Sequence, residues 1–297
     1  MGRYIEKRCV TALHKPPKGK GSPFDYDLNP YRGCEHRCQY CFAQYSHAYL
    51  EDGDYFGDIY VKTNIAERLD RELSGGGWDG TPLNLGGVTD CYQPCEARYQ
   101  LMPQVWRVLL KYKAPCILST KSSLILRDFE LIERLASQVY VNVACTITTL
   151  DRAAARKLEV GAAAPADRLE VLRAFAKTKA STGLHMMPIV PYITDGEDTI
   201  RALHQAGKEA GVDYVLPGML NLRGKTKETF LACVVREFPA QYRPIWAAYR
   251  TGHLDKAVGA RAYARVRAAQ RAFGIGAAYM APYYRRMEER AEQLTLF

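Results

Sequence analysis

The sequence predicts an α/β protein, a partial (β/α)6 barrel of the TIM type with a C-terminal helical lobe. Six short runs are rich in β-branched and aromatic residues, and polar, Gly or Pro residues bound each of them. These expected strands are 24–30, 83–88, 116–120, 139–147, 184–190 and 214–218. Helical patterns alternate with them, which is typical of parallel βαβ units in a barrel or a doubly wound sheet. Only helical patterns appear from about residue 223 onward.

The elements follow one another in a simple order. Residues 1–23 are expected to form an arm, because HKPPKGKGSP is rich in Pro, Gly and Lys and has no periodicity. Residues 24–222 are expected to form the barrel and residues 223–297 the helical lobe. Between strands, apolar residues recur at helical spacing in 64–74 and in 168–180.

Charge and composition narrow the class of protein. Lys and Arg outnumber Asp and Glu by 41 to 32 in 297 residues, which favours a polyanionic partner, with nucleic acid first. No run of 18 apolar residues appears, and MGRYIEKRCV is too polar for a signal peptide. We therefore expect a cytoplasmic protein with no membrane partner.

Three of the nine cysteines share one short loop, GCEHRCQYCFAQYSH. Cys34, Cys38 and Cys41 follow the first expected strand, so in a barrel they lie on the catalytic face. Three thiolates can ligate three irons of a cubane cluster and leave the fourth iron open to a ligand. The alternative is a Cys3His zinc site completed by His36 or His47.

The spacing C-x3-C-x2-C, with Tyr40 before the third cysteine and Phe42 after it, resembles the signature of the radical S-adenosylmethionine (SAM) enzymes. The resemblance implies a [4Fe-4S] cluster whose open iron is chelated by SAM. Reduction then yields a 5′-deoxyadenosyl radical. Tyr40 and Phe42 are expected beside the cofactor, and the family implies a reducing partner such as flavodoxin or ferredoxin.

The resemblance continues at the ends of the later strands. Further residues are expected to contact SAM there: Gly86, Gly87, Thr89, Lys121, Thr146, Thr148 and Arg168. Glycine lets the backbone approach a ligand closely. Lys121 is expected to pair with the methionine carboxylate. Arg168 is either a cofactor contact or a member of a salt bridge.

YRGCEHRCQYCFAQYSHAYL, GGVTDCYQP, LSTKS and KLEVG…RLE resemble the spore photoproduct lyase-like group over most of residues 24–195. The resemblance implies a carbon–carbon lyase for DNA repair that reverses a methylene-bridged thymine dimer. In that chemistry the radical abstracts hydrogen from C6 of the lesion. A cysteine then donates a hydrogen atom to the thymine methyl radical.

The sequence departs from that group at the donor position, which is Gly87 here. Cys91 and Cys95 lie just beyond, in TDCYQPCE, and are the expected donors. They could instead bind a second metal centre or be idle thiols. The tyrosine that follows the third cysteine in the group is replaced by Phe42, so a tyrosine relay would use another residue. Its candidates are Tyr40, Tyr45 and Tyr92.

The C-terminal region suggests two contacts with nucleic-acid machinery. The final QLTLF resembles the peptide by which bacterial repair proteins bind the DNA sliding clamp, through Gln293, Leu294, Leu296 and Phe297. The alternative is the apolar end of a helix that folds back on the core. Aromatic and basic residues upstream are candidates for stacking on DNA and for phosphate contacts: Tyr279, Tyr283, Tyr284, Arg285 and Arg286. The alternative is an amphipathic helix that packs on the core.

Two other functions stay open at this level. A radical SAM enzyme could act on RNA or a peptide instead of DNA. A zinc-stabilised nucleic-acid-binding protein without enzymatic activity would also use the clustered cysteines and the basic charge.

Overall fold

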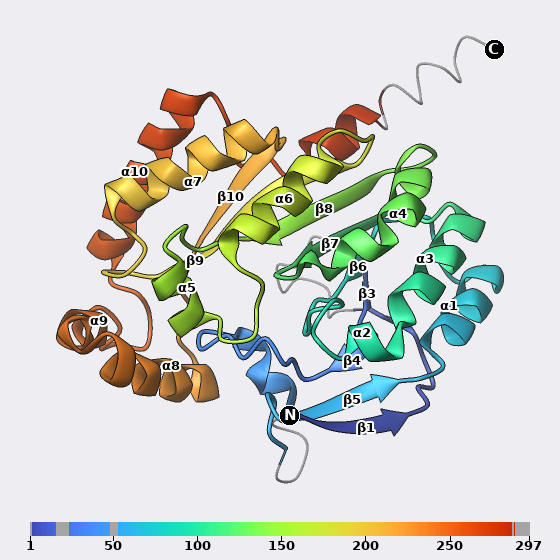
Figure 1. Ribbon diagram of the computed structural model, residues 1–297, viewed down its shortest axis with the longest axis horizontal. Coiled ribbons are helices and arrows are strands. Elements are labelled where there is room, and N and C mark those ends of the chain that lie inside the picture. Colours follow the sequence, from blue (N-terminus) through green and yellow to red (C-terminus); the bar gives the residue numbers. More distant parts are fainter. Residues whose placement is uncertain (1, 16–23, 48–52, 287, 289–297) are drawn as a thin grey trace.

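A computed structural model describes residues 2–15, 24–47, 53–286 and 288 (Figure 1). Its larger sheet has the order β10-β9-β8-β7-β6-β3-β2, in which β3 to β10 pair in parallel and β2 is antiparallel to β3. These strands are β2 (Leu13–His14), β3 (Tyr26–Leu28), β6 (Leu83–Leu85), β7 (Cys116–Thr120), β8 (Val141–Thr146), β9 (Ser181–Ile189) and β10 (Tyr214–Met219). All six predicted strands are present, and the α/β class is confirmed.

The parallel strands curve into a partial barrel. Ser119 on β7 contacts His185 on β9, two strands away, at 3.1 Å. Tyr214 on β10 likewise reaches past β9 to Asn142 on β8 at 3.0 Å. Side chains of second-neighbour strands meet in this way only on the concave side of a curved sheet, which we call the lumen.

Helices cover the convex side of the sheet (Figure 1). They are α1 (Ile65–Ser74), α2 (Glu96–Tyr99), α3 (Leu101–Tyr112), α4 (Phe129–Ala136), α6 (Pro165–Phe175) and α7 (Glu197–Ala210). Helix α5 (Arg152–Leu158) instead belongs to a second apolar core with the C-terminal helices. The apolar face of α1 is buried, as its spacing predicted. The expected helix 168–180 begins earlier, at Pro165, because proline suits the first helical turn, and it ends at Phe175.

The main core lies between the strands and these helices. Residues alternate in a strand, so Leu118, Val143 and Leu184 point outward into this layer and are fully buried. Trp106 of α3 is the largest fully buried side chain in the described part of the chain. The other strand face carries polar residues, which leaves the lumen available for a functional site.

A second, three-stranded sheet lies beside the cysteine loop. It consists of β1 (Arg3–Lys7), β4 (Tyr31–Arg32) and β5 (Asp58–Lys62), in the order β1-β5-β4. The predicted N-terminal arm therefore contains a strand, since residues 3–7 pair in parallel with β5. Main-chain pairing orders this segment, and apolar periodicity, which the segment lacks, gives no sign of it.

The helices expected after residue 223 are α8 (Gly224–Glu237), α9 (Tyr242–Ala248) and α10 (Lys256–Phe273). A second apolar core joins α8, α9 and the start of α10 to Tyr40, Leu158 and Val190 of the barrel. The remainder of α10 packs on α7. Gln293, Leu294, Leu296 and Phe297 of the clamp-like tail lie outside the described residues. Among the residues that the structure describes, no helix has the length and apolar character needed to span a membrane.

Candidate active site

The cysteine loop follows β4 at the carboxyl ends of the parallel strands. Cys34, Cys38 and Cys41 are all free thiols, and the first two are almost fully buried. The amide of Cys34 donates to the carbonyl of Tyr55 at 3.1 Å, and Cys38 forms an isolated β-bridge with Glu159. The loop is thus anchored by the segments before β5 and after α5.

Two backbone donors lie at the Cys41 sulfur. Burial raises the pKa of the Cys41 thiol, which donates to the Tyr55 hydroxyl at 3.7 Å, and the amides of Ala43 and Gln44 partly oppose this rise. These donors stabilise negative charge on sulfur, which ligation requires. Three free thiols on one loop fit a [4Fe-4S] cluster, which the three cysteines would hold.

The two histidines that could complete a zinc site have other partners. His36 Nδ1 lies 3.0 Å from the carbonyl of Gly161, and its Nε2 lies 3.1 Å from Asp90 Oδ2. His47 Nε2 lies 3.2 Å from the carbonyl of Asp58. Within the described residues, no three side chains of His, Cys, Asp or Glu converge on a position for one metal ion.

Asp90 connects the strand end after β6 to the cysteine loop. It accepts hydrogen bonds from the Thr120 hydroxyl at 2.7 Å and the Lys121 amide at 2.8 Å. Burial alone would raise its pKa, but the His36 ring and these donors outweigh burial and lower it. Thr89 donates to the carbonyl of Gly33 at 2.7 Å, so the predicted cofactor residue Thr89 is tied to the loop.

Glu159 is the centre of a buried charged cluster. Arg168 Nη2 lies 2.5 Å from Glu159 Oε2, and both side chains are at most 1% exposed. The hydroxyls of Tyr40 and Thr148 also donate to Glu159. Three predicted cofactor contacts, Tyr40, Thr148 and Arg168, are therefore brought together, and each uses polar atoms on Glu159.

Lys121 lies between this cluster and the lumen. Its Nζ is 5.9 Å from the centre of the Tyr40 ring. Burial lowers the pKa of Lys121, but Cys38, Glu159 and Asp90 outweigh burial and raise it, so the ammonium stays charged. The pairing of Lys121 with the methionine carboxylate stays a prediction.

A chain of hydrogen bonds runs along the lumen, and we call it the lumen chain. Its members are Ser119, His185, Tyr214, Asn142 and Ser181. It ends when Ser181 donates to the exposed carboxylate of Asp213 at 3.0 Å. Thr146, a predicted cofactor contact, lies 3.4 Å from Ser119 at the other end.

The hydrogen bonds of the lumen chain determine the tautomer of His185. The Tyr214 hydroxyl donates a hydrogen bond to Asn142 Oδ1 at 3.0 Å. His185 Nε2 must therefore be the donor in its contact with the Tyr214 oxygen. His185 Nδ1 is then an acceptor, and Ser119 donates to it at 3.1 Å. Burial and Lys121 lower the pKa of His185 to about 4, so the ring is neutral at pH 7.

Gly183 makes room for the lumen chain. A Cβ atom at this position would lie 2.1 Å from Cζ of Tyr214. The hydroxyl end of the phenol ring therefore occupies the space that a Cβ would need, and no other residue type fits there without moving Tyr214.

The expected donor residues lie behind the strand end. Cys91 and Cys95 are each 1% exposed and belong to the main core. A Cβ atom on Gly86 would lie 3.1 Å from Cys91 Sγ, so the backbone at Gly86 covers this thiol. Tyr92 is fully buried. Trp106 donates to the Tyr92 hydroxyl at 2.6 Å, and this hydroxyl donates to Asp128 at 2.9 Å.

The helical lobe supports the cysteine loop, which the sequence did not reveal. The Thr226 hydroxyl on α8 donates to the carbonyl of Cys41 at 2.9 Å, and Thr229 donates to Gln44 Oε1 at 2.9 Å. These partners are 185 residues apart in the chain, and two threonines on a helix carry no signal of such a contact.

Exposed aromatic residues lie next to the thiols. Phe42 and Tyr45 are 59% and 54% exposed, and their rings stack with centres 6.4 Å apart. Phe42 was expected beside the cofactor, and Tyr45 was a relay candidate. Their exposure suits a surface that meets a large ligand at the mouth of the barrel.

The tyrosines expected to stack on DNA lie at the opposite end of the strands. The ring of Tyr283 packs on Tyr140 at 5.2 Å, and that of Tyr279 on Tyr214 at 6.2 Å. Tyr140 and Tyr214 stand where β8 and β10 begin, whereas the cysteine loop lies at the carboxyl ends. Tyr279 and Tyr283 therefore lie away from the cysteine loop, and their contact with DNA stays a prediction.

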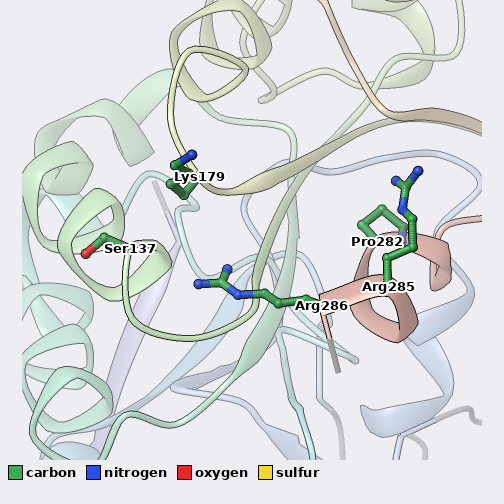
Figure 2. A pocket seen from close by; sticks show the side chains of 5 residues that line it. All are labelled: Ser137, Lys179, Pro282, Arg285 and Arg286. Carbon is green, nitrogen blue, oxygen red and sulfur yellow. The ribbon is translucent and has the colours of Figure 1, made fainter. Parts of the chain in front are cut away.

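The neighbouring basic residues border an open hollow of about 540 Å³ lined by Ser137, Lys179, Pro282, Arg285 and Arg286. Figure 2 shows that Arg286 extends toward Ser137 while Arg285 points elsewhere. Arg286 also donates to the carbonyl of Ala136 at 2.9 Å. These cations do not converge on one ligand position, and we do not assign the active site to this hollow.

Three thiols lie at the carboxyl ends of the barrel strands, beside Lys121, Arg168 and a polar lumen, which is an arrangement suited to a cluster-dependent enzyme. Residues 28–203 match the Radical SAM superfamily, and the chain belongs to this family. Its members use a [4Fe-4S] cluster and SAM.

The chain is also similar in sequence to other proteins and in fold to solved structures. An uncharacterized protein of Mycobacterium tuberculosis is 35% identical over 255 residues, which cover 84% of this chain and 74% of the relative. An uncharacterized protein of Methanocaldococcus jannaschii is 24% identical over 58% of this chain and 63% of its own. The fold is similar to that of spore photoproduct lyase complexed with dinucleoside spore photoproduct. That likeness has a TM-score of 0.67 and 13% identity and covers 91% of this chain and 79% of the lyase.

Proposed function

We propose that this chain is a radical SAM lyase for DNA repair that reverses a methylene-bridged thymine dimer. The observation that carries the proposal is the extent of the likeness to spore photoproduct lyase. It covers 91% of the chain, and so includes the helical lobe as well as the barrel. When bound, the cluster and SAM supply the radical that abstracts hydrogen from the lesion.

The surface at the mouth supports a nucleic-acid substrate. Phe42 and Tyr45 are exposed beside the cysteine loop, where aromatic rings can stack on bases. Arg152 and Arg156 line a hollow of about 280 Å³ on the same rim, and they can contact phosphate. A lesion would enter by extrusion from the duplex, which costs a few kcal/mol and less for a damaged base.

The lumen supports recognition of a polar heterocycle. Ser119 donates to His185, so its hydroxyl oxygen offers lone pairs to a substrate. Lys121 provides a positive charge near His185. A thymine ring carries one imide N–H donor and two carbonyl acceptors, and these groups can use both features.

Cys91 is the proposed hydrogen-atom donor. Burial raises the pKa of its thiol well above the usual value, so the group keeps the S–H bond that donation requires. The sulfur lies close to the strand end, since a Cβ added to Gly86 would be 3.1 Å from it. Cys95 differs, because its amide is bonded to Glu35 at 2.8 Å and its thiol also contacts Glu35.

The experiment is an anaerobic assay of the full chain with reconstituted cluster, SAM, a reductant and dinucleoside spore photoproduct. We expect thymidine to form with the wild type. We expect Cys91→Ala to cleave SAM and release aberrant thymine products, while Cys233→Ala behaves like the wild type. SAM cleavage without thymidine would reject this substrate and favour RNA or a peptide.

A further inference from the structure

The Tyr55 hydroxyl lies beside the cysteine loop. Tyr55 precedes β5 and is 5% exposed. Its oxygen lies 3.7 Å from Cys41 Sγ, and its proton goes to the carbonyl of Val88 at 2.9 Å. Cys34, Ala43 and Phe56 complete the small apolar cluster around it.

The fold holds Tyr55 at this position. Its carbonyl accepts from the Cys34 amide at 3.1 Å, and the edge of its ring meets His47 at 5.1 Å. Gly33 has a φ of +87°, and a Cβ there would lie 3.0 Å from the Tyr55 carbonyl oxygen and 2.5 Å from that of Asp58. Glycine at position 33 therefore permits the close approach of the loop to Tyr55.

Ligation changes the hydrogen bonding of Cys41. A cysteine bound to iron has lost its proton, so its sulfur only accepts hydrogen bonds. The Tyr55 phenol carries one proton that it can donate. That proton has two acceptors within reach, Val88 O and Cys41 Sγ.

We propose that the Tyr55 hydroxyl donates to the Cys41 sulfur when this cysteine ligates the cluster, and that this bond raises the cluster's reduction potential. Hydrogen bonds to ligand sulfurs stabilise the charge of the added electron, which makes reduction easier. Tyr55 acts through Cys41 and is thus a positioning residue. The inference rests on the family and not on the identity of the substrate.

Tyr55 is the donor that a substitution can remove. The backbone amides of Ala43 and Gln44 also face Cys41, but they persist in any variant. Tyr60 offers a matched control, because it is a partly buried tyrosine on β5 whose ring packs on His47 at 5.8 Å. Tyr55→Phe and Tyr60→Phe each remove one hydroxyl from the same neighbourhood.

The experiment is a reductive titration of the reconstituted full chain without SAM. Reduction is monitored through the electron paramagnetic resonance signal of the reduced cluster. Iron content is measured in parallel. For Tyr55→Phe we expect the ratio of reduced to oxidised cluster at a fixed poise to fall by about threefold to tenfold, where tenfold equals about 59 mV for a one-electron couple. Tyr60→Phe should match the wild type. A Tyr55→Phe midpoint equal to that of the wild type, at equal iron content, would overturn the proposal.

A second variant covers the case in which Tyr55→Phe loads no iron. Replacing Tyr55 by 3-fluorotyrosine keeps the ring and makes the phenol more acidic, and therefore a stronger donor. We expect the midpoint to move in the positive direction, opposite to Tyr55→Phe. An unchanged or more negative midpoint in the fluorinated protein would contradict a hydrogen bond to the Cys41 sulfur.

Discussion

The buried pair of Glu159 and Arg168 gives the sharpest prediction about stability. Arg168→Met leaves the carboxylate of Glu159 in a site where its side chain is 0% exposed. The change also removes donors from the carbonyls of Thr146, at 2.7 Å, and Ala163, at 2.8 Å. Breaking a buried pair by removing one partner costs about 3–5 kcal/mol. We expect about 3 kcal/mol of lost unfolding free energy, because Lys121 still compensates part of the charge.

The loss should depend on pH in a defined direction. In the wild type, burial would raise the pKa of Glu159, but Arg168 and Lys121 outweigh burial and lower it below 4.5. The pair therefore stabilises the wild type above that pH and stops doing so as Glu159 is protonated in acid. In Arg168→Met the pKa of Glu159 rises, so this variant gains from protonation. The difference in stability should therefore shrink as the pH falls toward 4.5.

The assay is urea unfolding at several pH values, with Arg173→Met as the control. Arg173 lies on the same helix and pairs with Glu170 at the surface, so its loss should change stability by less than about 0.5 kcal/mol. Arg168→Met/Glu159→Gln should recover part of the loss, since no carboxylate then stays unpaired. A loss below about 1 kcal/mol for Arg168→Met, independent of pH, would refute this reasoning.

Three further predictions concern the metal site, the lumen and the outer helices. Replacing Cys34, Cys38 or Cys41 by Ala should abolish the bound iron of anaerobically reconstituted protein. Cys233 is buried in α8, and Cys233→Ala should retain the iron. Equal iron in all four variants would disprove the ligand assignment. Gly183→Ala should lower the free energy of unfolding by about 1–3 kcal/mol, because its Cβ would overlap Tyr214. Gly276 has open space around it, so Gly276→Ala should change the free energy of unfolding by less than about 0.5 kcal/mol. Tyr92→Phe should lower the unfolding free energy by about 1–3 kcal/mol, because Trp106 loses its acceptor and Asp128 loses one of its donors, while iron loading stays unchanged. A lost cluster with intact stability would instead favour a role near the cofactor.

The strands and the cysteine loop could be predicted because each depends on a local pattern. The run 139–147 is apolar and β-branched, and residues 141–146 form β8. The spacing of Cys34, Cys38 and Cys41 likewise lies within eight residues of chain. Such features need no knowledge of what packs against them.

The rest of the site depends on contacts between distant segments. Glu159 is one residue of a loop, and its role arises only when Arg168, Tyr40 and Thr148 meet around it. Tyr55 lies in a segment with no motif, and its hydroxyl is placed by the packing of the cysteine loop. The depth of Cys91 behind Gly86 also comes from the turn after β6, which the sequence alone does not describe.

The most direct test of the proposed lyase uses spore photoproduct labelled with deuterium at C6. The full chain is reconstituted anaerobically and supplied with SAM and a reductant, and the products are analysed by mass spectrometry. If the chain reverses this lesion, thymidine forms and deuterium appears in 5′-deoxyadenosine. Unlabelled 5′-deoxyadenosine without thymidine would contradict the proposed substrate, although the family and its cofactors would stand.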